Sequence, residues 1–245
     1  MRTDYDEIAS NYKQTRSHPI KQYVEAFTFL KVLGRVEAKS VLDLACGEGY
    51  YTRLIKQQGA AQVVGVDISA NMISHAQEME NGVPLGIEYR VHDATNCGQL
   101  GDFDRVTAVS LFPYASTKQV LTAMCQTMYD NLRPGGKLVS ITINPHISEN
   151  LGIYEQYGLR MFADDGLRDG ASMTAIIDLP DGSIKLSNNY WVQETYEETL
   201  QSVGFEKIIW HPYQVSEEGL AAYGEEYWKD FLVRPYTLIL ECQKL

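Results

Sequence analysis

The stretch Asp43-Leu44-Ala45-Cys46-Gly47-Glu48-Gly49 decides the fold of this chain. It overlaps the end of a short apolar run at residues 40–44 and leads into a helical pattern at residues 51–58. Glycine lets the backbone turn sharply and approach a ligand closely, and the free amides at the start of a helix can face polar ligand atoms. A strand, a glycine-rich turn and a helix in this order therefore predict the ligand-binding corner of a parallel α/β sheet.

Outward from this corner, short apolar runs alternate with helical stretches. The predicted strands after residues 40–44 cover residues 63–67, 87–91, 103–109 and 137–143, and the predicted helices after residues 51–58 cover residues 69–80 and 118–132. Apolar strands separated by helices are typical of βαβ units, in which helices cover both faces of a parallel sheet. The sequence therefore predicts a doubly wound α/β fold.

The alternation changes after Asn144. We expect a loop rich in aromatic residues to about Gly170, and then a β-hairpin around Asp181-Gly182, because two β-prone segments flank this pair. A helix at residues 194–203 and strands at 205–210 and 236–241 complete a mostly parallel sheet of seven strands. Tyr223, Tyr227 and Phe231 recur every four residues, which predicts the buried face of one further helix.

A chain of 245 residues is long enough for one α/β domain of this kind. We expect a single domain with four parts, namely an N-terminal helical cap at 1–38, a ligand-binding core at 39–144, a substrate lid with the hairpin at 145–190, and a C-terminal helix with strands at 191–245.

Two acidic residues follow the second and third predicted strands. Asp67 ends the second strand, and a carboxylate there can accept hydrogen bonds from both hydroxyls of a ribose. Asp93, with the amide of Ala94, stands at the corresponding end of the third strand, where it can contact the edge of an adenine. The alternatives are a helix N-cap for Asp67 and a solvated loop aspartate for Asp93.

The residues around the glycines favour S-adenosylmethionine (SAM) over a dinucleotide. The third glycine of the G-x-G-x-x-G pattern is replaced by Thr52, and Asp43 stands just ahead of the turn, where its charge would repel a pyrophosphate. The methionine part of SAM carries an ammonium and a sulfonium, so a carboxylate is favourable there. An NAD(P)-dependent oxidoreductase is the rival enzyme that these two residues argue against.

The chain resembles the class I SAM-dependent methyltransferases, which have a Rossmann-like sheet of seven strands. Residues 43–49 resemble the glycine motif of that family, Val66-Asp67-Ile68-Ser69 with Met72 its ribose motif, His92-Asp93-Ala94 its adenine motif, and residues 132–138 the turn before its fifth strand. The resemblance covers nearly the whole chain and implies SAM as cofactor, with S-adenosylhomocysteine (SAH) as product.

The resemblance also implies roles for individual residues. The adenine would lie between Ile68 and Met72, and Ser110 would lie near the sulfonium. The segment around Tyr5 and Tyr12 is similar to the N-terminal segment that closes over SAM in members acting on small molecules. The implied cofactor-binding residues are Tyr12, Asp43, Ala45, Cys46, Gly47, Gly49, Asp67, Ile68, Met72, Asp93, Ala94 and Ser110.

More narrowly, the chain resembles the toxoflavin-synthase-type methyltransferases, which N-methylate an azapteridine-like heterocycle. Segments that carry this likeness include residues 23–30 and Trp210-His211-Pro212. The expected function is therefore methyl transfer to a ring nitrogen of a flat heterocycle in secondary metabolism. O- or C-methylation of another small metabolite and a catalytically silent SAM- or SAH-binding regulator are the alternatives.

The sequence offers no clear catalytic residue, because methyl transfer from a sulfonium mainly needs alignment of the reacting atoms and exclusion of water. If a general base is used, Tyr12, His146 and His211 are the candidates, although each histidine also fits a bland packing or surface role. The candidate substrate residues are Tyr5, Phe112, Tyr114, Asn144, Tyr157 and Trp191.

The composition of the chain excludes several classes of binding partner. A net charge of −11 disfavours nucleic acid, and there is no basic cluster to offset it. The four cysteines are scattered, which argues against a zinc site and fits a reducing cytoplasm. No apolar run is long enough for a membrane span or a secretory signal. We expect a cytoplasmic monomer or homodimer that needs no metal and acts on a small-molecule acceptor.

Overall fold

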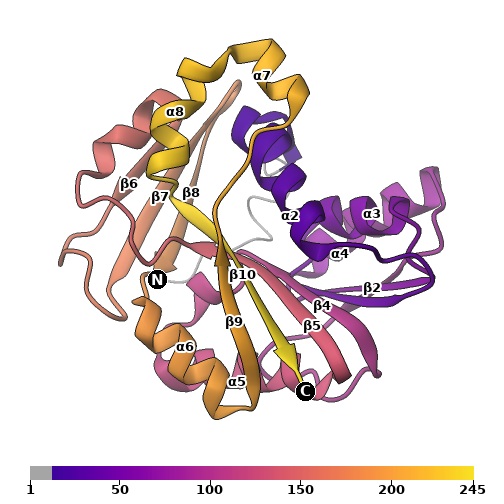
Figure 1. Ribbon diagram of the computed structural model, residues 1–245. Coiled ribbons are helices and arrows are strands. Elements are labelled where there is room, and N and C mark those ends of the chain that lie inside the picture. The colour runs from indigo at the N-terminus through magenta and orange to yellow at the C-terminus, as the bar shows by residue number, and fades with distance from the viewer. Residues whose placement is uncertain (1–12) are drawn as a thin grey trace.

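The computed structural model describes residues 13–245 and is built around one large sheet (Figure 1). Its strands are β1 (Ser40–Leu44), β2 (Gln62–Asp67), β3 (Glu88–Val91), β4 (Phe103–Val109), β5 (Leu132–Ile143), β9 (Phe205–His211) and β10 (Thr237–Lys244). The order is β3-β2-β1-β4-β5-β10-β9, and only β10 runs antiparallel to its neighbours. The predicted doubly wound sheet of seven strands is confirmed.

Helices cover both faces of this sheet and create three layers (Figure 1). One face packs against α2 (Ala26–Leu33), α3 (Tyr50–Gln57) and α4 (Ala70–Gly82), and the other against α5 (Lys118–Asp130) and α6 (Gln193–Ser202). The strands are apolar on both sides. In β1 the consecutive residues Val41 and Leu42 point to opposite faces, and each is fully buried in the core on its own side. This two-sided burial is the physical reason why the strands read as continuous apolar runs.

The N-terminal helical region is less regular than the sequence suggests. It consists of a 3-10 turn η1 (Lys13–Ser17) and a π-helical turn η2 (Lys21–Glu25) that continues directly into α2. In η2 the Ala26 amide donates to the Lys21 carbonyl, five residues back, where an α-helix would bond four residues back. The wider turn changes the direction of the side chains at its two ends.

A small antiparallel sheet follows β5, where the sequence suggested mainly a loop. It comprises β6 (Leu159–Phe162), β7 (Ser172–Leu179) and β8 (Gly182–Asn189), and it is preceded by the 3-10 helix η4 (Leu151–Tyr157). The predicted loop to Gly170 is therefore wrong where β6 forms. The run of only four residues gives too short an alternation to read, and its pairing with β7 supplies the missing stability.

The predicted hairpin between β7 and β8 is present, with its turn one residue earlier than expected. Leu179 pairs with Gly182, so Pro180 and Asp181 form the loop and Gly182 begins the second strand with a φ of 137°. Because only glycine adopts such a φ readily, the glycine still fixes the reversal of the chain.

The C-terminal aromatic periodicity does not form one helix. Gly224 has a φ of 78° and separates α7 (Glu217–Tyr223) from α8 (Glu225–Val233). Phe231 is fully buried, but Tyr223 is 42% exposed, so the prediction of a common buried face is wrong. Within the part of the chain that the structure describes, no helix is both long and apolar enough to cross a membrane.

Candidate cofactor and acceptor site

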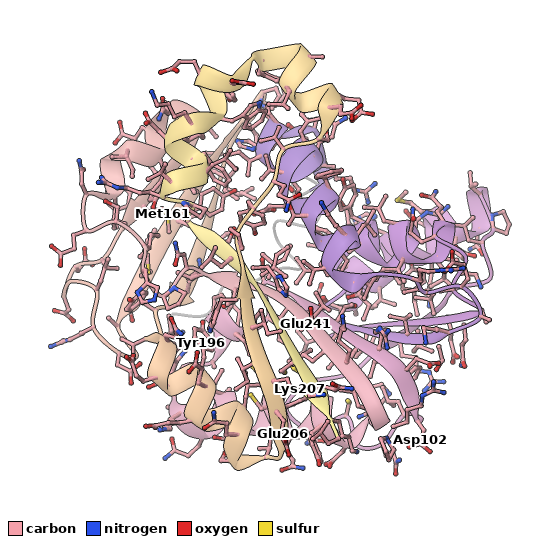
Figure 2. All side chains as sticks on the ribbon, viewed as in Figure 1. Asp102, Met161, Tyr196, Glu206, Lys207 and Glu241 are labelled. Atoms are coloured by element: carbon pink, nitrogen blue, oxygen red, sulfur yellow. The ribbon has the colours of Figure 1, made fainter. Side chains whose placement is uncertain are left out.

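A cavity of about 490 Å³ lies at the carboxyl ends of the parallel strands. It extends from the loops after β1, β2 and β3 to the small sheet of β6, β7 and β8. In Figure 2, Met161 of β6 lies on the side of the small sheet, well away from Asp102, which directly precedes β4. The cavity therefore occupies the edge of the main sheet where open α/β folds bind their ligands.

The glycine-rich turn after β1 is held in an unusual backbone conformation. Ala45, Gly47 and Gly49 all have positive φ values, of 57°, 54° and 83°. Gly47 lines the cavity, and a Cβ there would meet no atom within 4 Å, so the backbone is open to a ligand. Gly49 does not line the cavity; a Cβ there would collide with the hydroxyl of Tyr89. Its absent side chain lets the turn pack against β3.

Asp67 joins two of the cavity loops through its carboxylate. Oδ2 accepts a hydrogen bond from the Gly47 amide at 2.8 Å, and Oδ1 accepts one from the Ser69 amide at 2.9 Å. A carboxylate can accept about four hydrogen bonds, so Asp67 can hold both loops and still serve a ligand diol. The helix N-cap role that the sequence left open belongs to Ser69, whose side chain accepts from the Met72 amide.

Asp43 lies behind the turn and does not line the cavity. It is 1% exposed, and its two carboxylate oxygens accept hydrogen bonds from the hydroxyls of Thr52 at 2.6 Å and Thr107 at 2.7 Å. Burial raises the pKa of Asp43 to about 6, although both hydrogen bonds lower it. The family resemblance places Asp43 among the cofactor-binding residues, but its side chain does not reach the cavity. Asp43 instead braces α3 and β4 against β1.

The loops after β2 and β3 form the far end of the cavity. Ile68 is 43% exposed at its rim, whereas Met72 is 1% exposed beneath it. Asp93 and Ala94 line the same region, and Asp93 accepts hydrogen bonds from the amide and hydroxyl of Thr95. The apolar side chains of Ile68 and Met72 suit the faces of a flat ring such as adenine. The Asp93 carboxylate and the Ala94 backbone suit its polar edge.

Comparisons with known proteins match this arrangement to methyltransferases. Residues 41–136 match the family model described as a methyltransferase domain. The chain is 25% identical over 173 residues to N-demethylindolmycin N-methyltransferase of Streptomyces griseus, covering 70% of this chain and 71% of that one. It is 31% identical over 108 residues to a ubiquinone biosynthesis O-methyltransferase of Xanthomonas axonopodis pv. citri, covering 42% and 43%. Residues 41–136 therefore form a methyltransferase domain, and the comparisons support a SAM-dependent methyltransferase.

The fold comparison agrees with the sequence comparison. The crystal structure of a SAM-dependent methyltransferase from Mesorhizobium loti superposes with a TM-score of 0.65 at 19% identity, covering 93% of this chain and 99% of that chain. Apart from the Streptomyces relative, the chain spans about half the length of the curated relatives that head the comparison. The methyltransferase domain and the matching solved structures, which include DhpI complexes with SAH and with SAM at 19% and 20% identity, support SAM as the cofactor.

Of the residues predicted for the cofactor, most of those the structure describes line the cavity. They are Ala45, Cys46, Gly47, Asp67, Ile68, Met72, Asp93, Ala94 and Ser110. Ser110 has a φ of 59°, an uncommon backbone conformation for a residue with a side chain, at the point where β4 ends beside the cavity. Asp43 and Gly49 support the turn from behind, and Tyr12 lies outside the described residues.

The predicted substrate residues are mostly not at the cavity of the methyltransferase. Tyr114 lines it, whereas Tyr5 lies outside the described residues. Four others are committed to packing: Phe112 lies against Tyr196, Asn144 donates to the Pro235 carbonyl, Tyr157 donates to the Tyr227 carbonyl, and Trp191 donates to the Ala115 carbonyl. The aromatic residues of this region mainly form the core of the small sheet and its contacts with the main domain.

The two histidines proposed as general bases are also away from the cavity. His146 Nε2 is paired with Gln193 Oε1 at 2.6 Å, and His211 Nε2 with Glu241 Oε2 at 2.9 Å. Their positions match the packing and surface roles that the sequence left open. Among residues 13–245, no group of three or more His, Cys, Asp or Glu side chains is arranged to hold a metal ion.

Sequence reasoning missed the residues that form the end of the cavity at the small sheet, which is called the acceptor end below because an acceptor molecule could bind there. Five apolar residues of the small sheet form one wall, and the N-terminal turns supply polar side chains opposite. The wall consists of Leu159, Met161, Ala175, Ile177 and Leu186, and the polar side chains are Thr15, His18, Lys21 and Glu25 with Tyr236 and Thr237 of the C-terminal segment. The alternation of Leu159 and Met161 within β6 was the one available signal.

The N-terminal turns are anchored to the glycine-rich turn by an ion pair. Arg16 Nε lies 2.5 Å from Glu48 Oε1, and the Glu48 side chain is 6% exposed. The Arg16 guanidinium also lies over the Tyr50 ring at 5.9 Å from its centroid. These contacts hold η1 beside the cofactor end of the cavity, so the N-terminal region contributes to the site that the later loops create.

Proposed function

We propose that the methyltransferase transfers the methyl group of SAM to a ring nitrogen of a small, flat heterocycle. The observation that carries the proposal is the continuity of one cavity of about 490 Å³ from the loop of Asp67 to the apolar wall of Met161 and Ala175. Small-molecule sites typically enclose roughly 300–1,000 Å³ and combine apolar walls with a few polar groups.

At the cofactor end, each cavity residue fits one part of SAM. Asp67 would accept hydrogen bonds from the ribose hydroxyls, and Ile68 and Met72 would enclose the adenine, whose edge would meet Asp93 and Ala94. The backbone at Ala45, Cys46 and Gly47 would lie along the methionine and the ribose, with Ser110 near the sulfonium. Asp43 would stabilise the positive methionine end from behind the turn, because its charge is only partly screened there.

The chemistry requires little more than alignment. SAM, when bound, supplies an already activated methyl group, so the protein must hold the acceptor atom in line and exclude water. Residues 145–190 would act as the substrate lid, since β6, β7 and β8 supply the apolar wall. Apolar side chains on that wall favour a flat, weakly hydrated ring over a highly charged metabolite.

Nitrogen is the preferred acceptor atom because of one relative. The Streptomyces griseus protein, which matches over 70% of this chain, is named for N-methylation of N-demethylindolmycin, a small molecule. The resemblance to the toxoflavin-synthase type supports an azapteridine-like acceptor in secondary metabolism. The O-methyltransferase relatives match only about half of the chain, and the match to the Xanthomonas protein covers 42% of it.

Calorimetry and mass spectrometry together test this proposal. The purified protein is titrated with SAM, SAH and NADH, and it is then incubated with SAM carrying a deuterated methyl group and a panel of heterocycles. The panel contains N-demethylindolmycin and azapteridines with unmethylated ring nitrogens. We expect SAM and SAH to bind, NADH not to bind, and one heterocycle to gain the labelled methyl group on nitrogen. Labelling on oxygen or carbon would contradict the choice of acceptor atom, and SAH binding without any transfer would favour a regulator.

A further inference from the structure

The acceptor end of the cavity contains a buried carboxylate that the cofactor does not require. Glu25 is 8% exposed and lines the cavity from the last residue of η2. Its Oε1 accepts a hydrogen bond from the Thr237 hydroxyl at 3.0 Å, and the Thr237 oxygen is paired in turn with the Tyr213 hydroxyl at 2.9 Å. The Tyr236 hydroxyl is a further hydrogen-bonding partner of the carboxylate.

This carboxylate is unfavourable for the fold by itself. Burial raises the pKa of Glu25, and the nearby Lys21 ammonium and the Thr237 hydroxyl lower it only in part. An apolar side chain of similar size would avoid the cost of removing a carboxylate from water. A buried ionisable group at the wall of a cavity is more typical of functional sites than of packing.

The backbone around Glu25 supports the same interpretation. Lys21 and Glu25 begin and end the π-helical turn, and both side chains line the cavity. Single π-turns are unfavourable within helices and occur frequently at functional sites. The Lys21 ammonium also lies 5.6 Å from the centroid of the Tyr50 ring, on the cavity side of α3.

We infer that Glu25 is an acceptor-binding residue that takes a hydrogen bond from a ring N–H of the heterocycle. The inference rests on the proposed function, because it concerns the acceptor and not SAM. An ionised carboxylate can accept hydrogen bonds but cannot donate them. It therefore selects rings that present a donor N–H and disfavours rings whose nitrogen is already alkylated. The Lys21 ammonium, in the same segment, would donate a hydrogen bond to a neighbouring carbonyl of the ring.

The pH dependence of this binding follows from the groups that face Glu25. From its own segment these are His18 and Lys21, from α3 Tyr50, from the segment after β9 Tyr213, and from the segment entering β10 Tyr236 and Thr237. Burial outweighs the groups that lower the pKa of Glu25, so its carboxylate takes up a proton at a higher pH than an ordinary glutamate does. As the pH falls, ring binding should therefore weaken before the usual glutamate range is reached. Removal of the Thr237 hydroxyl should move this weakening to higher pH.

The test uses the full chain saturated with SAH and two probes, an azapteridine with a free ring N–H and the same ring with that nitrogen methylated. Calorimetry measures the affinity of both probes for the wild type, Glu25→Gln, Thr237→Val and, as a control, Glu37→Gln, an exposed glutamate whose side chain is 56% exposed. A hydrogen bond to a charged group corresponds to a preference of roughly 10- to 100-fold for the N–H probe.

We expect the wild type and Glu37→Gln to show this preference, and Glu25→Gln to show a several-fold smaller preference with unchanged affinity for SAH, because its neutral amide oxygen accepts a weaker hydrogen bond. Thr237→Val should keep the preference at neutral to alkaline pH, but as the pH falls the preference should be lost at a higher pH than in the wild type. An undiminished preference in Glu25→Gln, or a wild type that binds SAH but does not distinguish the probes, would overturn the inference. Loss of SAH binding by the wild type would instead contradict the proposed function.

Discussion

The two ends of the cavity are built in different ways. The cofactor end consists of loops that each follow a parallel strand, and a single carboxylate, Asp67, joins two of them through backbone amides. The acceptor end consists of side chains brought together from distant segments; Glu25 and Thr237 are 212 residues apart. Changes at the first end should therefore disturb the backbone and SAM together, and changes at the second should alter which acceptor is bound.

The largest effect is expected at Asp67. Asp67→Ala removes the acceptor for two amides and for the ribose hydroxyls. Each hydrogen bond to a charged group contributes about 1.5–3 kcal/mol, so SAH affinity should fall by roughly 100-fold or more. Calorimetry provides the measurement, and Asp93→Asn, which keeps the size of the side chain, provides the comparison with a smaller loss. If Asp67→Ala bound SAH with wild-type affinity, the proposed difference between the two ends of the cavity would be wrong.

A pH-dependent effect is expected at Asp43. Its pKa rises from 3.8 to about 6 in the folded protein, so the folded state holds this proton more tightly than the unfolded state. The free energy of unfolding should therefore fall by roughly 3 kcal/mol as the pH rises from about 4 to about 6.

Urea unfolding across this pH range, compared between the wild type and Asp43→Asn, isolates the contribution of Asp43. The difference in unfolding free energy between the two proteins should change in this window and stay constant above it. Parallel pH profiles for the two proteins would show that Asp43 is not a strained buried acid. SAH binding near pH 7 should weaken in Asp43→Asn, because the missing charge lies behind the methionine end.

A smaller effect on stability is expected in the glycine-rich turn. Gly49→Ala places a Cβ against Tyr89 and forces a φ of 83° on a residue with a side chain. We expect the free energy of unfolding to fall by about 2 kcal/mol or more. Gly135→Ala is the matched control, because Gly135 has a φ of 77° but no neighbour within 4 Å of the added Cβ. Equal losses in the two variants would leave no role for the contact with Tyr89.

The smallest effect is expected at the apolar wall. Met161→Ala shortens a side chain on the acceptor side of the cavity, which is visible in Figure 2 well away from Asp102. If one or two of the lost groups contact the acceptor, at about 0.8 kcal/mol for each buried methylene-sized group, the KM for a heterocyclic acceptor should rise roughly 4- to 15-fold. The affinity for SAM should not change. An equal loss for SAM and acceptor would mean that the ends are not independent.

Most of the residues predicted to bind the cofactor line one cavity because each loop there is specified locally. Asp67 ends one apolar strand and Asp93 follows the next, and the parallel order of the strands brings these positions to one edge of the sheet. The same local reading cannot distinguish a side chain that lines a cavity from one behind it. For that reason Asp43 and Gly49 could be recognised as part of the turn but not as its internal supports.

The acceptor end could not be predicted in this way. The aromatic residues predicted to contact the substrate, such as Tyr157 and Trp191, do not line the cavity and are used in packing. Glu25 lies in a segment whose pattern indicates an ordinary helix, and its role depends on a π-turn and on a partner at the other end of the chain. Such tertiary pairing leaves no periodic trace in the sequence.

Hydrogen–deuterium exchange with sequential ligands tests the two-ended cavity most directly. SAH is added first, and an azapteridine with a free ring N–H is added second. SAH should protect the backbone at residues 43–49, 66–72 and 92–94, and the heterocycle should then protect residues 21–25, 159–161 and 175–186. Protection of the same segments by both ligands, or heterocycle protection without any change in the small sheet, would contradict the assignment of the acceptor end.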